Sequence, residues 1–291
     1  MATACYQANG QGNTVRCKKA LPEYSVLMAV YIKDVPEWFE MAIESMANQT
    51  LKPKEIVIIA DGEITQELRD VQKRCSERYP GMIRCVALEK NAGLAEALRY
   101  GVSICECEWI ARMDSDDIAE PKRCEEELIL ALEKNADIVG CNFDEFLGTV
   151  DNVVAKRVYP ESHDELVRLS RRRSPFCHPA VLMKKSAVLR AGNYRKAWLY
   201  EDYDLFVRML ADGAIGCTVP KILFHMRVDE NFYRRRGGVR YVKTLLRFNV
   251  QLLKMGWMRP TDFLMRSCGN IIFGLVSPGL RGWLYRRFLR K

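Results

Sequence analysis

Short apolar runs alternate with longer amphipathic stretches through the first half of the chain. Apolar runs of about four to eight residues between turn residues are typical of buried strands, and apolar positions three or four apart are typical of helices. The pattern predicts strands at 24–31, 55–60, 83–88, 108–113 and 137–143, and helices at 35–46, 64–78, 91–105 and 121–134. This alternation, with short connections, indicates an α/β fold with a doubly wound, mostly parallel sheet.

The pattern weakens after residue 145 and becomes helical and cationic near the end. It predicts an edge strand at 153–159, strands at 180–183 and 215–227, and helices at 184–191, after Tyr200, at 238–255 and at 261–276. The first residues are polar and lack periodicity. The predicted organisation is therefore a disordered or flexible N-terminus at 1–22, an α/β domain at 23–230 and a basic, amphipathic helical appendage at 231–291.

Positive charge is concentrated in the C-terminal part. The whole chain has a net charge of +8, and the residues from Arg227 onward contain 15 Lys and Arg against 3 acids, a net +12, which leaves −4 for the rest. A basic tail on a mildly acidic body indicates an anionic partner. Because apolar residues are interleaved with the cations, an anionic membrane surface is favoured over nucleic acid.

Residues 279–291 combine Trp and Leu with four Arg and one Lys, a composition typical of an interfacial helix, although a helix packed on the body or docked to a partner would look the same. The apolar run 271–276 is too short to span a bilayer, which needs about 20 residues. The N-terminus has no apolar segment of a signal peptide, and the 11 Cys include no C-x-x-C pair. We expect a cytoplasmic protein, peripheral at the inner face of the cell membrane.

Carboxylates follow two of the predicted strands. Asp61 ends the second strand, and Asp114, Asp116 and Asp117 end the fourth. Parallel strands place their carboxyl ends at one edge of a sheet, where α/β proteins bind ligands. Carboxylates suit Mg²⁺ or Mn²⁺, which would carry a diphosphate, although an acidic turn that caps the next helix is an equally simple interpretation. Neither G-x-G-x-x-G nor a P-loop motif follows any strand, so a dinucleotide or P-loop site is not expected.

With these motifs in place, the chain resembles a family-two glycosyltransferase with the A-type fold. The resemblance covers about residues 24–228 and depends on the order and spacing of several segments. They are the first strand with Asn48-Gln-Thr, the second strand with Asp61-Gly62, Asn91-Ala-Gly-Leu, Met113-Asp-Ser-Asp-Asp117, His178-Pro179 and Glu201-Asp-Tyr-Asp-Leu205. The sequence departs from the family at the first strand, where Ala29 and Ile32 replace the usual Pro and Asn, and at Asp61, where the family often has two acids. The most similar subset makes bacterial surface polysaccharides on lipid-linked acceptors.

The resemblance implies transfer of a hexose from a nucleoside-diphosphate sugar, with UDP favoured over GDP, to a hydroxyl of a saccharide acceptor. It places the donor nucleotide against Ala29, Tyr31, Asp61 and Asn91. Asp116 is the expected direct ligand of Mn²⁺ or Mg²⁺, and Asp114 contacts the ribose or a metal-bound water.

On the acceptor side, the resemblance makes Asp202 the general base of an inverting reaction, with His178 and Glu201 near the acceptor. Acids in the first turn of a helix are also favoured by its dipole, so Glu201 and Asp202 have a structural alternative. The sequence leaves open whether His225 binds metal.

Other classes of protein fit less well. A nucleotidyltransferase would have a Gly-rich basic loop after its first strand, and a D-x-D phosphatase would have its motif there rather than after the fourth strand. A non-catalytic nucleotide-sugar binder or a membrane-recruited scaffold stays open as the alternative, but neither would need the acids at 61, 114, 116 and 202 together.

Overall fold

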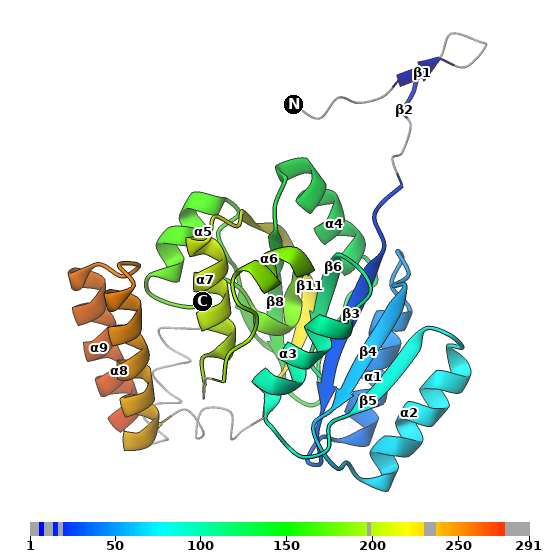
Figure 1. Cartoon of the computed structure of the whole chain (residues 1–291), viewed down its shortest axis with the longest axis horizontal. Helices are drawn as coiled ribbons and strands as arrows, with labels where there is room; N and C mark the ends of the chain where they lie inside the picture. The colour runs from blue at the N-terminus through cyan, green and yellow to red at the C-terminus, as the bar shows by residue number, and fades with distance from the viewer. Residues whose placement is uncertain (1–5, 9–13, 17–19, 197–198, 230–236, 277–291) are drawn as a thin grey trace.

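A nine-stranded sheet forms the centre of the molecule, with helices on both faces (Figure 1). The computed structural model describes residues 6–8, 14–16, 20–196, 199–229 and 237–276. Near the N-terminus, β1 (Tyr6–Ala8) and β2 (Thr14–Arg16) pair antiparallel, which the polar sequence of that segment did not predict.

The elements of the domain follow the predicted alternation. The strands are β3 (Tyr24–Val30), β4 (Glu55–Ala60), β5 (Ile83–Ala87), β6 (Trp109–Met113), β7 (Ile118–Ala119), β8 (Ile138–Phe146), β9 (Val153–Arg157), β10 (Val181–Lys184) and β11 (Gly216–Arg227). The helices are α1 (Pro36–Ala47), α2 (Gln66–Arg78), α3 (Leu94–Ile104), α4 (Arg123–Lys134), α5 (His163–Ser170), α6 (Lys185–Arg190), α7 (Glu201–Ala211), α8 (Val239–Lys254) and α9 (Pro260–Leu275), with a 3₁₀ turn at His178–Ala180.

The sheet order is β5-β4-β3-β6-β10-β8-β11-β7, with β9 paired to β8. Strands β3 to β6 are parallel to one another, β10 is antiparallel to both β6 and β8, and β11 is parallel to β8. Because β10 reverses direction between β6 and β8, those two strands point the same way. Six strands therefore share one direction while β7, β9 and β10 oppose it, which confirms a mostly parallel sheet.

Two apolar clusters fill the spaces between the sheet and its helices. One face packs Phe39, Ile43 and Met46 of α1 and Leu128 of α4 against the sheet. The other face packs α3, α6 and α7. Gly101 of α3 lies so close to Leu27 that a Cβ there would overlap the leucine side chain, so the glycine lets α3 approach β3 closely.

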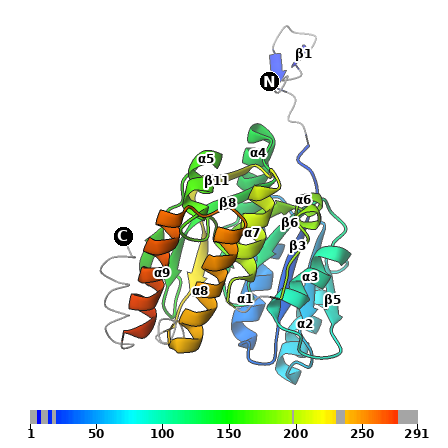
Figure 2. The ribbon, with the colours of Figure 1, turned by 60° about the vertical axis from the view of Figure 1, so that its left-hand side comes forward.

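Helices α8 and α9 form a hairpin beside α7 (Figures 1 and 2). The aromatic ring of Phe248 on α8 stacks on Tyr200 at 4.2 Å between centroids, and Gln251 Nε2 donates to Asp204 Oδ1 at 3.1 Å. The helical appendage predicted from the sequence therefore packs on the α/β body. The predicted interfacial helix at 279–291 lies outside the described residues. Within the described ranges, no helix has both the length and the apolar character needed to span a membrane.

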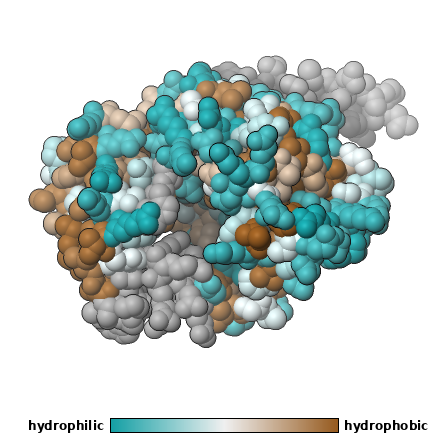
Figure 3. All heavy atoms as spheres, turned by 60° about the horizontal axis from the view of Figure 1, so that its bottom comes forward, coloured by the Kyte–Doolittle hydropathy of each residue, from teal (hydrophilic) through white to brown (hydrophobic). Residues whose placement is uncertain are grey.

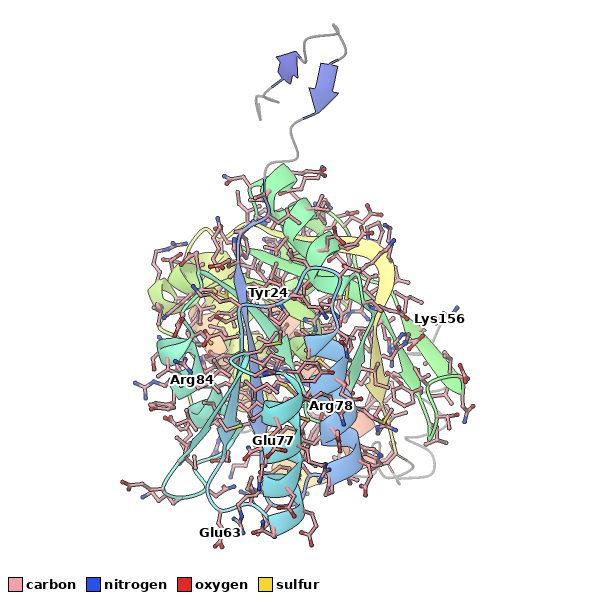
Figure 4. The ribbon with its side chains drawn as sticks, turned by 90° about the vertical axis from the view of Figure 1, so that its right-hand side faces the viewer. Tyr24, Glu63, Glu77, Arg78, Arg84 and Lys156 are labelled. Carbon is pink, nitrogen blue, oxygen red and sulfur yellow. The ribbon has the colours of Figure 1, made fainter. Side chains whose placement is uncertain are left out.

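Sheet direction places the ends of β4 and β6 at one edge. Figure 3 views this edge, whose centre is hollowed. In Figure 4, Glu63 in the loop after β4 lies at the bottom of the molecule, far below Tyr24 at the start of β3. Because β3, β4 and β6 are parallel, Asp61 and Asp114 both follow the carboxyl ends of their strands.

Candidate active site

An acidic cluster follows β6. The carboxylates of Asp114, Asp116 and Asp117 offer oxygen atoms that all lie within 4.8 Å of one another. Burial raises the pKa of Asp116 to about 7, and repulsion from Asp114 and Asp34 contributes. Burial and its two acidic neighbours also raise the pKa of Asp117. Three hard oxygen donors that repel one another suit a divalent cation, whose charge would relieve the repulsion. The residues present therefore fit Mn²⁺ or Mg²⁺.

The last residue of β11 fixes the loop that carries these acids. The backbone N–H of Arg227 donates to Asp117 Oδ1 at 2.7 Å, and its Nε donates to the backbone carbonyl of Asp116 at 2.9 Å. Its guanidinium lies over the ring of Trp38, 4.6 Å from the centroid. Asp117 is almost fully buried and its Oδ1 accepts this bond, so it fixes the loop while Asp116 lies closer to the open edge.

Asp34 is a site residue that sequence reasoning missed. Its Oδ2 accepts the backbone N–H of Tyr31 at 3.0 Å and the hydroxyl of Ser115 at 2.8 Å. Burial raises the pKa of Asp34 to about 6, the two hydrogen bonds oppose that shift, and Asp114 adds to it. The residue joins the loop after β3 to the loop after β6. Asp34 lies just after the first predicted strand, and this position could have identified it. The sequence analysis used the segment only to place the helix at 35–46.

The structure brings Asp61 and Asn91 together in the loop before α3. The carboxylate of Asp61 accepts the backbone N–H groups of Ala92 and Gly93, at 2.7 and 2.9 Å. Asn91 Nδ2 donates to the backbone carbonyl of Asp61 at 3.2 Å. This loop explains why α3 begins at Leu94 rather than at the predicted Asn91, since Gly93 adopts φ 92°.

Ala29 and Tyr31 belong to the neighbouring strand. Ala29 lies in β3 and packs beside the second apolar cluster, and Tyr31 follows the strand with a side chain that is 41 % exposed. Ala29 pairs with Ile59 across the β3–β4 ladder, and Ile59 lies two residues before Asp61. The predicted nucleotide-side residues therefore come from adjacent strands and the loop that Asp61 holds.

A buried cation, Arg112, lies beneath the acids. It precedes Asp114 by two residues on β6, forms an ion pair with the Asp114 carboxylate and is 1 % exposed. Its Nε and Nη2 atoms have no hydrogen-bond acceptor among the described residues. Asp114 supports the charge of Arg112, whose pKa is raised although burial alone would lower it. The sequence shows this residue only as a polar interruption of an apolar strand.

Replacing Arg112 with methionine is expected to lower the free energy of unfolding by about 2 kcal/mol. Removing one partner of a buried pair costs about 3–5 kcal/mol, and solvent at Asp114, whose side chain is 36 % exposed, reduces that cost. Thermal unfolding measures the effect. Arg112→Lys retains the charge and should recover most of the stability. An unchanged melting temperature for Arg112→Met would contradict a stabilising role for the pair.

Helix α7 brings a second pair of acids to the same site. Burial and repulsion from Asp202 raise the pKa of Glu201 to about 7, with Asp114 adding to the shift and Arg112 opposing it. Glu201 therefore lies within electrostatic range of Arg112 at the end of β6 and of Asp114 just after it. Asp202 directly follows Glu201 on α7, and its role as the general base stays a prediction.

His178 lies near the same acids but makes its own contact. Its Nε2 is 2.8 Å from the Tyr194 hydroxyl, and burial together with the Arg112 charge holds the pKa of His178 well below its usual value. A neutral imidazole can position a hydroxyl but offers no charge to an acceptor phosphate. Tyr194 was not predicted, because an isolated tyrosine after a short helix carries no sequence signal.

His225 lies between two carboxylates. Its Nδ1 is 2.7 Å from Asp144 Oδ1, and its Nε2 is 2.8 Å from Glu120 Oε1. Burial would lower the pKa of His225, but the hydrogen bonds with Glu120 and Asp144 outweigh it and raise the pKa. Both ring nitrogens are engaged in joining β7, β8 and β11, so this geometry favours a structural role over metal binding.

The fold matches solved structures over most of its length. A mannosyltransferase from Pyrobaculum calidifontis, determined with GDP-Man and Mn²⁺, aligns with TM-score 0.61 and 15% identity over 90% of this chain and 72% of that one. S. aureus TarS, residues 1–349 with UDP-GlcNAc, aligns with TM-score 0.61 and 16% identity over 92% of this chain and 73% of that one. The chain therefore shares the A-type fold of these proteins.

Sequence comparison gives the family. The profile described as glycosyl transferase family 2 matches residues 25–191, and the chain belongs to this family. It is 35% identical over 273 residues to the Escherichia coli UDP-Gal:alpha-D-GlcNAc-diphosphoundecaprenol beta-1,3-galactosyltransferase, covering 93% of this chain and 98% of that protein. It is 34% identical over 257 residues to the amylovoran biosynthesis glycosyltransferase AmsE of Erwinia amylovora, covering 86% and 94%. The predicted family is therefore confirmed.

Proposed function

We propose that this glycosyltransferase moves a hexose from a UDP-sugar to a hydroxyl of a lipid-linked saccharide, with inversion at the anomeric carbon, in the synthesis of a bacterial surface polysaccharide. The observation that carries the proposal is the cluster of Asp114, Asp116 and Asp117 after β6, with Arg112 acting electrostatically both on this cluster and on Glu201 of α7. The similarity to the E. coli galactosyltransferase, which acts on a diphosphoundecaprenol-linked sugar, supports the choice of donor and acceptor.

The donor diphosphate belongs beside the acidic cluster. Asp116 would bind Mn²⁺ or Mg²⁺ directly, and Asp114 would contribute a second oxygen or contact the ribose. When bound, the cation neutralises charge on the departing diphosphate. The raised pKa of Asp116, to about 7, supports this assignment, because the cluster lacks a compensating positive charge besides Arg112 and Arg227.

The nucleoside would extend from the cluster toward β3 and β4. In the proposal, Asp61 accepts an N–H of the base, and Ala29, Tyr31 and Asn91 line the rest of the pocket. The carboxylate of Asp61 already accepts two backbone N–H groups, and each carboxylate offers about four lone-pair directions. A further N–H donor can therefore be accommodated, and the loop bonds fix the direction from which it must arrive.

Acceptor activation is the task of α7. In this proposal Asp202 takes the proton of the acceptor hydroxyl as the oxygen attacks the anomeric carbon. The new C–O bond forms on the face opposite the diphosphate, whose C–O bond breaks, and UDP leaves with the bonding electrons. An α-linked donor then gives a β-linked product. Glu201 directly precedes this acid, and Glu201 and His178, whose Nε2 contacts the Tyr194 hydroxyl, would position the acceptor saccharide.

The protein would act at the cytoplasmic face of the membrane, where a lipid-linked acceptor is available. Peripheral attachment is consistent with the net +12 charge from Arg227 onward. Attraction of this segment to anionic lipids supports the location, with no part for nucleic acid.

A nucleotide-release screen tests the proposed function. The protein is incubated with UDP- and GDP-sugars, Mn²⁺ or Mg²⁺, and a synthetic lipid-pyrophosphate saccharide, and released nucleotide and glycosylated lipid are measured. UDP release that requires both acceptor and divalent cation is the expected result. Tight UDP-sugar binding without release under any combination would instead identify a non-catalytic binder or scaffold.

A further inference from the structure

The α8–α9 hairpin has an outward side that is apolar. The side chains of Val239, Leu264, Ile272 and Leu275 are 73, 64, 58 and 57% exposed. Positions 264, 271 and 275, separated by seven and four residues, lie on one side of α9 at helical spacing. Figure 3 shows apolar side chains gathered at the left, where the hairpin lies. Apolar surface gathered in this way on a folded protein indicates an interaction site.

A groove of about 600 Å³ runs along this side between the two helices. Its apolar lining includes Leu246 and Val250 of α8 and Ile271 of α9, and Lys243 and Arg247 also line it. Helix α8 contains four cations and no acid, and no described carboxylate pairs with Lys243 or Arg247. Apolar side chains with unpaired cations beside them complement an anionic lipid surface, where the cations meet phosphates and the apolar groups enter the acyl boundary.

The opposite side of the hairpin is firmly attached to the body. Arg266 of α9 hydrogen-bonds the Tyr203 hydroxyl of α7, and Arg172 Nε donates to Asp262 Oδ1 at 2.8 Å. Between the two helices, Gly274 leaves no room for a Cβ against Val242, so the helices approach closely. The hairpin and α7, which begins with Glu201 and Asp202, therefore form one packed unit.

We propose that the outward face of α8 and α9 binds the surface of an anionic bilayer and thereby holds α7 beside the membrane. The role of this attachment in catalysis rests on the proposed function, since a lipid-linked acceptor would then reach Asp202 without leaving the bilayer. The attachment itself depends only on the apolar groove and its cations. It assigns membrane binding to a folded hairpin in addition to the basic segment 279–291.

Co-sedimentation of the full chain with vesicles tests the attachment without any substrate. Vesicles of phosphatidylcholine alone are compared with vesicles that also contain phosphatidylglycerol. The double variant Ile272→Glu/Leu275→Glu should weaken partitioning tenfold or more, about the effect of losing one buried leucine. Lys243→Gln/Arg247→Gln should weaken it about 25-fold on anionic vesicles alone, from about fivefold per cation. Leu132→Glu, an exposed leucine of α4, is the matched control and should bind normally.

Other occupants give different results. If removal of residues 277–291 abolishes binding while the hairpin variants bind normally, the hairpin is not the membrane site. If the hairpin variants shift the protein from dimer to monomer in light scattering and vesicle binding is unchanged, the face contacts a second copy. UDP release with a water-soluble acceptor is measured in parallel. If no preparation releases UDP while vesicle binding is intact, the proposed function is rejected and the membrane site is not.

Discussion

Replacing Asp116 with asparagine is expected to reduce sugar transfer on the order of 10³-fold, because charge stabilisation at the leaving group is among the largest contributions to such reactions. Asparagine keeps the size of the side chain and one oxygen, but removes the charge that a divalent cation needs. Burial, together with repulsion from Asp114 and Asp34, raises the pKa of Asp116 to about 7, and a cation bound there relieves that repulsion. The variant should therefore fold at least as stably as the parent protein.

Binding of Mn²⁺ separates the metal site from other causes of inactivity. Electron paramagnetic resonance titration should show a much weaker Mn²⁺ complex for Asp116→Asn in the presence of UDP. Asp117→Asn is the matched control, because its Oδ1 can still accept the N–H of Arg227. We expect that variant to keep Mn²⁺ affinity within about tenfold. Equal losses in both variants would show that the two acids share the ion, and normal activity of Asp116→Asn would remove it from the site.

Much of this site could be predicted because the relevant signals are local. The apolar runs that became β3, β4 and β6 are buried on both faces, so they read as continuous hydrophobic segments. Parallel strands then require that residues after each run meet at one edge. This reasoning placed Asp61 and Asp114 at the same edge of the sheet, and the parallel ladders of β3 with β4 and β6 agree.

The residues that were missed depend on long-range contacts. Arg112 is an isolated charge within a strand, and its significance comes from burial beside Asp114, Tyr194 and Glu201. The backbone N–H of Arg227 reaches Asp117, 110 residues earlier in the chain. Neither contact leaves a periodic or compositional mark. Helix α5 was missed for a related reason, since only Leu166 and Ser170 of its eight residues are buried and the apolar pattern is short.

The sequence predicted the two helices of the α8–α9 hairpin. It did not predict that one side of the hairpin packs on the body while the other side is exposed and apolar. Hydrophobic periodicity identifies an apolar face without saying what covers it. In α8, Phe248 and Leu252 pack toward α7, whereas Val239 and Val250 lie on the exposed side. A helix with apolar groups on both sides meets two different environments, and only the packing shows which side belongs to the body.

Replacing Asp202 with asparagine should reduce transfer by about 10²–10⁴-fold while leaving the affinity for UDP-sugar nearly unchanged. A positioned general base contributes about 10²–10⁴-fold to rate, and an acceptor hydroxyl without it is a poor nucleophile. The donor contacts in the proposal come from β3, β4 and β6, so loss of a charge on α7 should affect kcat and not donor binding. Single-turnover transfer and calorimetric binding of UDP-sugar measure the two quantities separately.

Glu201→Gln decides between the two acids that begin α7. Burial and the neighbouring Asp202 raise the pKa of Glu201 to about 7, so near neutral pH only part of it is ionised and able to accept a proton. Its substitution should change acceptor KM more than kcat, since its expected role is to hold acceptor hydroxyls. If Glu201→Gln abolishes transfer while Asp202→Asn keeps normal turnover, the base is Glu201. Direct displacement allows attack only from the side opposite the departing diphosphate. Every variant with residual activity should therefore still give a product with inverted configuration at the anomeric carbon.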